Sequence, residues 1–135
     1  MTDRDLVSKK LAQIETCVQE LRTLARPEEI ENDVREERFV EHTLQIAVQA
    51  VIDVATHIVS DERLGEPRKN SELFDLLKRY GWIPTDLADS LQKMAGFRNI
   101  LVHGYDAVDL GIVQDILANH LDDLLGFVRA IRAKL

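Results

Sequence analysis

One short stretch of the chain holds residue types that could act on a phosphodiester. Arg98, Asn99, His103 and Tyr105 follow one another closely along the sequence. A guanidinium can hold two phosphate oxygens at once and offset the negative charge of a transition state. An imidazole titrates near neutral pH and can transfer a proton. These residue types therefore predict phosphodiester chemistry, in which Asn99 orients a neighbouring group without adding charge.

Arg98 lies where the pattern of its predicted helix calls for an apolar residue. The helix begins near Pro84, and its stripe continues on both sides of Arg98 with Leu87, Leu91, Met94, Leu101 and Val102. A charge at such a position needs a partner or lines a cleft. One alternative is an internal partner such as Asp53, which would make Arg98 structural.

The spacing of Arg98 and His103 sets a geometric condition on their cooperation. Positions five residues apart lie about 140° apart around a continuous α-helix. The two side chains therefore meet more easily if the helix ends near His103, as Gly104 suggests. The other solution is a twofold axis that brings a second copy of the segment alongside.

The apolar periodicity of the whole chain predicts an all-α antiparallel bundle with four long helices and one short helix. The second helix is apolar on two sides, because Ile46, Ala50 and Val54 form an additional row. Such a helix either lies centrally in its bundle or meets a partner chain. The predicted helices run from about residue 7 to Pro27, from 34 to 60, from an Asn70-Ser71 cap to a stop at Gly81, from Pro84 to Gly104, and from an Asp109 cap to 135.

Composition narrows the class of protein. The 135 residues predict a single domain over 1–135 with a net charge of −7, and one cysteine, Cys17, excludes a disulfide framework. Residues 63–105 carry more basic than acidic residues, so they form either a modestly basic face or a mixed solvated surface. We expect a cytoplasmic protein with no membrane span, because no long apolar run and no signal peptide is visible.

The remaining polar candidates have structural explanations. Asp53 and His57 lie one helical turn apart. This spacing predicts that they form an internal hydrogen-bonded pair rather than a functional site. Asp106 and Asp109 flank the motif, where they either tune His103 or bind a cation, or simply serve as loop and cap residues. Tyr80 and Trp82 stack a base or, more simply, pack a turn against the bundle. His42, His57 and His120 lack metal-ligand spacing, and no glycine-rich phosphate loop is present, so neither a metal nor a cofactor is expected.

The motif resembles that of a known protein family. The run from Arg98 to Tyr105 looks like the Arg-x-x-x-x-His-x-Tyr signature of HEPN-domain proteins, and within them it most resembles the HepT toxins of MntA/HepT toxin–antitoxin modules. Two longer segments, 41–57 and 91–105, also read like that family and occur in the same order. The resemblance covers nearly the whole chain, so 1–135 is interpreted as one HepT-like domain.

This resemblance implies a specific activity. HEPN proteins are helical bundles that form homodimers, with both motifs facing one cleft, and active members are metal-independent endoribonucleases that use the ribose 2′-hydroxyl. Carried over, Arg98 would hold the scissile phosphate, His103 would be the general acid or base, and Asn99 would position the RNA or the histidine. Tyr105 matches the tyrosine that a nucleotidyltransferase antitoxin modifies with AMP.

Two other classes of function remain open at this stage. The chain could be a non-catalytic helical partner of a nucleotidyltransferase, or a purely structural bundle dimer. The first predicts a stable complex without nuclease activity. The second predicts that removing the Arg98 guanidinium changes stability alone.

Overall fold

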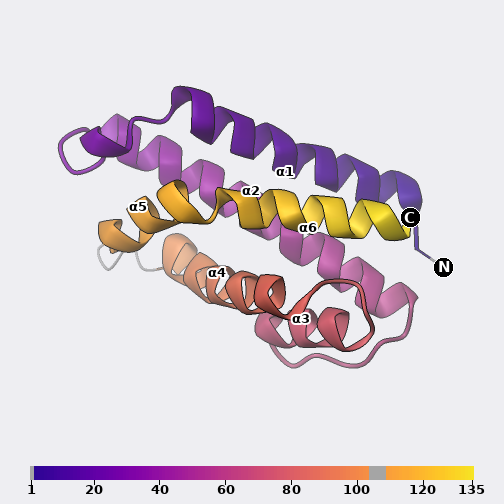
Figure 1. Ribbon diagram of the computed structural model, residues 1–135. Coiled ribbons are helices and arrows are strands. Elements are labelled where there is room, and N and C mark those ends of the chain that lie inside the picture. Colours follow the sequence, from indigo (N-terminus) through magenta and orange to yellow (C-terminus); the bar gives the residue numbers. More distant parts are fainter. Residues whose placement is uncertain (1, 104–108) are drawn as a thin grey trace.

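The first helix of the bundle begins at a capping aspartate. The computed structural model describes residues 2–103 and 109–135, with the backbone alone at 101–103 (Figure 1). Helix α1 spans Arg4–Leu24, and the Asp3 carboxylate accepts hydrogen bonds from the backbone N–H groups of Asp5 and Leu6. The helix ends before Pro27, as predicted, and the short 3-10 turn η1 (Pro27–Glu29) leads into the next helix.

Helix α2 (Val34–Asp61) lies at the centre of the bundle and contacts α1, α3, α4 and α6. Its additional apolar row is covered within the chain, since Ala50 and Val54 are buried and Ile46 is half-buried against the core. The two-sided pattern therefore reflects a central helix rather than a face left for a partner chain. By length and apolar composition alone α2 is also able to cross a membrane, but most of that stretch is buried inside the protein.

Helices α3 (Asn70–Arg79) and α4 (Thr85–His103) pack against each other and against α2. The predicted Asn70-Ser71 cap is displaced: α3 starts at Asn70 itself, after Lys69, whose side chain makes no capping bond. Gly81 ends the turn after α3 with a φ of 80°, a conformation that glycine adopts without steric cost. Pro84 immediately precedes α4 rather than lying inside its first turn.

The last predicted helix is divided in two, so the expectation of a single helix from Asp109 to 135 was wrong. Helix α5 (Leu110–Asn119) begins, as expected, at the Asp109 side chain, which accepts a hydrogen bond from the Gly111 N–H. Helix α6 (Leu121–Lys134) follows after His120. The His120 Nδ1 lies 2.9 Å from Asp123 Oδ2 and its Nε2 lies 3.1 Å from Asp115 Oδ2. These contacts from both flanking helices hold the bend.

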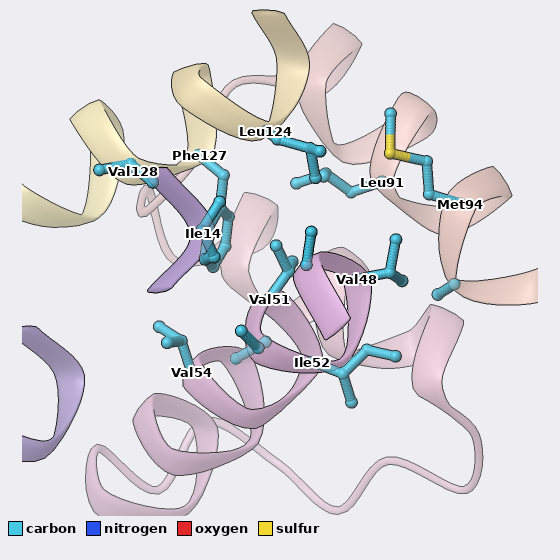
Figure 2. Close-up of a cluster of buried hydrophobic side chains, with 14 of the residues drawn as sticks. Ile14, Val48, Val51, Ile52, Val54, Leu91, Met94, Leu124, Phe127 and Val128 are labelled. Carbon is cyan, nitrogen blue, oxygen red and sulfur yellow. The ribbon is translucent and has the colours of Figure 1, made fainter. Parts of the chain in front are cut away.

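The described part of the chain is thus all-helical, with six α-helices and no strand. The core runs between α1, α2, α4 and α6, as the close-up in Figure 2 shows. Phe127 and Leu124 of α6 enter it from one side and Leu91 and Met94 of α4 from another, over Val48 and Val51 of α2. The C-terminal end of α4 follows the buried Leu91 and Met94 and lies at the same end of the molecule as α5 (Figure 1).

Candidate functional site

The Arg98 side chain is half-buried near the C-terminal end of α4, and no carboxylate in the described ranges 2–103 and 109–135 pairs with it. Its Nε atom is buried and has no hydrogen-bond partner, and its Nη1 donates a long hydrogen bond of 3.5 Å to Asn99 Oδ1. Among the described residues it forms no ion pair. A half-buried cation without a counter-charge is costly unless an anion binds. Arg98 therefore has the surroundings of an anion-binding residue.

The internal partner considered for Arg98 is engaged elsewhere. Asp53 Oδ2 lies 3.2 Å from Lys10 Nζ, and Asp53 Oδ1 accepts a 2.8 Å hydrogen bond from Gln49. The predicted pair between Asp53 and His57 was therefore wrong, since His57 Nε2 instead lies 2.9 Å from Asp61 Oδ2. Helical spacing allowed the Asp53–His57 pair, but neighbours on α1 and one turn further along α2 provide nearer partners.

The other motif residues are described only in part. Asn99 is exposed beside Arg98. Helix α4 includes His103 in its described range, and the position of His103 lies about 140° from that of Arg98 around this continuous helix. The His103 side chain, Gly104, Tyr105 and Asp106 lie outside the described residues. The structure thus places Arg98 and Asn99 together at the end of α4 and leaves the other roles as predictions.

A groove between α4 and α5 is a feature that the sequence pattern did not reveal. Its volume is about 440 Å³. Lys93, Phe97 and Ile100 line it from α4, Ile112 and Asp115 line it from α5, and His120 closes it at the bend before α6. The signal that was available is that Ile100 and Ile112 fall outside the apolar stripes of their helices, so the bundle core does not account for them.

Among the other candidates, Trp82 and Cys17 have structural roles, but Tyr80 does not pack against the bundle as its structural explanation required. Trp82 packs against the core, and the Lys134 Nζ lies 5.8 Å from the centre of its ring, whereas Tyr80 is exposed. Cys17 is buried, and burial together with the charge of Glu20 raises the pKa of its thiol, which disfavours reactivity. Within the described ranges, no three His, Cys, Asp or Glu side chains gather in a way that could hold a metal ion.

One carboxylate has surroundings that disfavour its charge. Glu41 on α2 has a buried Oε1 without a hydrogen-bond partner. Burial first, and then the charge and a hydrogen bond of Glu37 one turn earlier, raise the pKa of Glu41, and only the Arg38 charge opposes this shift. The protonated form of Glu41 is therefore more favoured in the folded protein than in the unfolded chain.

Replacing this carboxylate by an amide should stabilise the protein at neutral pH. A raised folded-state pKa contributes stability that is present below the unfolded pKa of Glu41 and is lost as the pH rises through the folded value. We expect Glu41→Gln to have a higher free energy of unfolding than the wild type near pH 7, with the difference shrinking toward about pH 4. Urea titrations at both pH values measure this. Glu66→Gln, at an exposed loop position, is the control, and an equal gain at both pH values would contradict the explanation.

Comparison with known proteins places this bundle and its motif in one family. The family model described as ribonuclease HepT-like matches residues 11–131. The chain therefore belongs to the HepT-like ribonuclease family, as the resemblance of its Arg98–Tyr105 run predicted.

Its relatives include proteins with named activities. The mRNA nuclease HepT of Shewanella oneidensis is 33% identical over 131 residues, which cover 96% of this chain and 98% of that protein. The tRNA nuclease HepT of Aphanizomenon flos-aquae is 34% identical over 97 residues, covering 72% of this chain and 66% of that protein. A solved structure of the tri-AMPylated Shewanella oneidensis HEPN toxin in complex with its MNT antitoxin superposes with a TM-score of 0.89 at 32% identity and covers 97% of this chain and 99% of that chain.

Proposed function

We propose that this protein is the toxin of a toxin–antitoxin module and acts as an RNA endonuclease in the cytoplasm. The observation that supports this most is the half-buried Arg98 guanidinium, which has no carboxylate partner among the described residues and lies five positions before His103 on α4. An RNA phosphate supplies the missing counter-charge. The nuclease names of relatives that cover most of this chain agree with the proposal.

The proposed reaction needs no metal ion. The ribose 2′-oxygen attacks the adjacent phosphorus, the bond to the 5′-oxygen breaks, and the products are a 2′,3′-cyclic phosphate and a free 5′-hydroxyl. Arg98 holds the non-bridging phosphate oxygens and offsets the charge that grows on them. His103 acts as general base toward the 2′-hydroxyl or as general acid toward the 5′-oxygen. Asn99, beside Arg98 on α4, positions the RNA or the imidazole.

The site requires a homodimer in this proposal. Residues 98 and 103 lie on different sides of one continuous helix, so a single α4 does not direct both toward one phosphate. A twofold axis next to the end of α4 places Arg98 of one subunit close to His103 of the other. The cleft between the subunits then contains two copies of each group.

RNA cleavage in the presence of a chelator tests this function. We expect the purified wild-type protein to cleave RNA in excess EDTA and to leave 2′,3′-cyclic phosphate ends, which mass spectrometry of the fragments identifies. Activity that EDTA abolishes and Mg²⁺ restores would refute the metal-free mechanism. Absence of cleavage under all conditions, combined with tight binding to a nucleotidyltransferase, would favour the non-catalytic partner instead.

We also propose that a nucleotidyltransferase antitoxin silences the toxin by adding AMP to Tyr105. Each AMP unit carries a phosphate, and negative charge next to the RNA cleft repels the substrate backbone. The tri-AMPylated state of the related Shewanella toxin supports this regulation.

The modification has a direct readout. After incubation with ATP and the partner enzyme, we expect peptide mass spectrometry to find AMP adducts on Tyr105 and cleavage activity to fall. Tyr105→Phe should acquire no adduct and stay active, whereas Tyr80→Phe, which changes an exposed tyrosine at the C-terminal end of α3, should be modified like the wild type. Adducts confined to other residues would reject the assignment of Tyr105.

A further inference from the structure

Gly96 lies in the middle of helix α4, at a position where the fold of the chain does not require a glycine. After proline, glycine is the least favourable residue in the interior of a helix. Gly96 does not have a positive φ, and a Cβ built on it would meet no atom of the described chain within 4 Å beyond its own stretch of helix. Neither backbone conformation nor internal packing therefore explains the glycine, which leaves the close approach of another molecule as the physical reason for it.

Gly96 shares one face of α4 with two residues of the motif. Gln92, Gly96, Asn99 and His103 follow one another at steps of four, three and four residues, so their positions lie within about 60° of one another around the helix. We call these four positions the polar strip of α4. Gly96 lies about 20° from position 103 around the helix and roughly 10 Å from it along the axis. A molecule that reaches His103 along the polar strip therefore passes over Gly96.

The polar strip offers hydrogen-bonding groups on both sides of the bare backbone. Asn99 is exposed, its Oδ1 accepts the long bond from Arg98, and its amide group donates no hydrogen bond within residues 2–103 and 109–135. Gln92 is half-buried, and its Nε2 donates a 3.0 Å hydrogen bond to the carbonyl oxygen of Ser71, which holds the side chain at the start of α3. Amide side chains pair with the edges of nucleic-acid bases, so this surface suits a nucleotide better than it suits an apolar partner.

We propose that the bare backbone at Gly96 receives a nucleotide of the RNA that flanks the scissile phosphate. The sugar and base of this nucleotide lie directly against the helix, and the free amide group of Asn99 donates a hydrogen bond to the base edge. Any side chain at position 96 holds the RNA away from the helix. Gly96 thereby determines whether the phosphate comes within reach of His103. This role rests on the proposed nuclease function and adds a substrate-binding position to it.

The variant Gly96→Ala should change stability and RNA cleavage in opposite directions. Alanine favours the helix at this exposed position, so we expect the melting temperature to rise by about 3 °C. With a labelled RNA in EDTA, kcat/KM should fall at least about tenfold, mainly through a higher KM, because the substrate no longer fits against the helix. Gly96→Leu, which adds a larger side chain that also favours a helix, should lose more activity than Gly96→Ala.

Gly126→Ala is the matched control for this substitution. Gly126 also lies within a helix, α6, and a Cβ at this position would make an ordinary van der Waals contact of 3.7 Å with Leu87. We expect Gly126→Ala to be more stable than the wild type as well, but to cleave RNA at the wild-type rate. Loss of cleavage in Gly96→Ala alone would therefore come from a contact with the RNA and not from a stiffer helix.

Binding of an RNA that cannot be cleaved tests the contact separately from the chemistry. An oligonucleotide with fluorine in place of each 2′-hydroxyl lacks the nucleophile, and fluorescence anisotropy gives its dissociation constant. We expect this constant to be about tenfold higher for Gly96→Ala than for the wild type. The dependence of binding on salt concentration should be the same for both proteins, because the substitution removes no contact with a phosphate.

The outcomes separate this contact from the proposed function. If Gly96→Ala binds and cleaves RNA like the wild type, the contact is refuted while the nuclease stands. If Gly96→Ala becomes monomeric in sedimentation velocity, position 96 contacts a second copy and the inference fails. If the wild type binds the fluorinated RNA but cleaves no RNA, and Gly96→Ala binds it less tightly, the contact stands and the nuclease assignment fails. A wild type that neither binds nor cleaves RNA would overturn both.

Discussion

Purified His103→Ala should cleave RNA about 10² to 10⁴ times more slowly than the wild type, while folding and dimerising normally. The expected loss is the contribution of a positioned imidazole to proton transfer, which no neighbouring group in the motif can replace. Single-turnover cleavage of a labelled RNA in EDTA measures it, because this regime isolates the chemical step from product release.

The same assay can separate the effect of the positive charge at position 98 from that of the guanidinium geometry, through the variants Arg98→Ala and Arg98→Lys. We expect Arg98→Ala to lose activity to a similar degree, and Arg98→Lys to recover little, since a single ammonium cannot hold two phosphate oxygens at once. Arg79→Ala and His57→Ala are the controls, because Arg79 is an exposed residue at the end of α3 and His57 is paired with Asp61 at the far end of α2. If both His103→Ala and Arg98→Ala cleaved RNA at the wild-type rate, the assignment of these two residues to the active site would be refuted.

Phe127→Ala should lower the free energy of unfolding by about 3–5 kcal/mol, as expected for truncating a fully buried phenylalanine. Phe127 is 0% exposed and lies on α6 beside Leu124 and Ile14, where α6 packs against α1 (Figure 2). Removing the ring opens a cavity that these neighbours fill only in part. The total free energy of unfolding of a domain of this size is about 5–15 kcal/mol, so the loss is a large share of its stability.

Thermal and urea unfolding followed by circular dichroism measure this effect. We expect the melting temperature to fall by about 10 °C or more. Leu24→Ala is the matched control, since Leu24 at the end of α1 is 60% exposed and its truncation should cost less than about 0.5 kcal/mol. A small loss in Phe127→Ala would show that the interface between α6 and α1 repacks without the ring.

The sequence pattern predicted those parts of the fold that depend on local chemistry. Pro27 cannot continue a helix, and Gly81 adopts a positive φ without cost, so the ends of α1 and α3 were predictable. Arg98 stood out because it interrupts an apolar stripe. The family was recognisable from the residues around it, and the comparisons confirmed it.

The features that the sequence pattern did not predict depend on contacts that the pattern does not encode. The stripe continues across His120, so periodicity alone could not show the bend, which the two flanking aspartates hold. Asp53 was assigned to His57 because that partner was near in sequence, whereas its actual partner, Lys10, comes from α1. The α4–α5 groove exists only after two helices are placed side by side, and no local rule predicts their separation.

The single cysteine of the chain gives the molecule a natural reporter of its own opening motions. Cys17 lies on the buried face of α1 with only 4% of its surface exposed, and its raised pKa keeps it in the unreactive thiol form. A thiol-specific reagent can therefore reach it only when α1 detaches from α2 and α6. The rate of alkylation thus reads out how often the outer helix lifts from the bundle in the native state, without any engineered label.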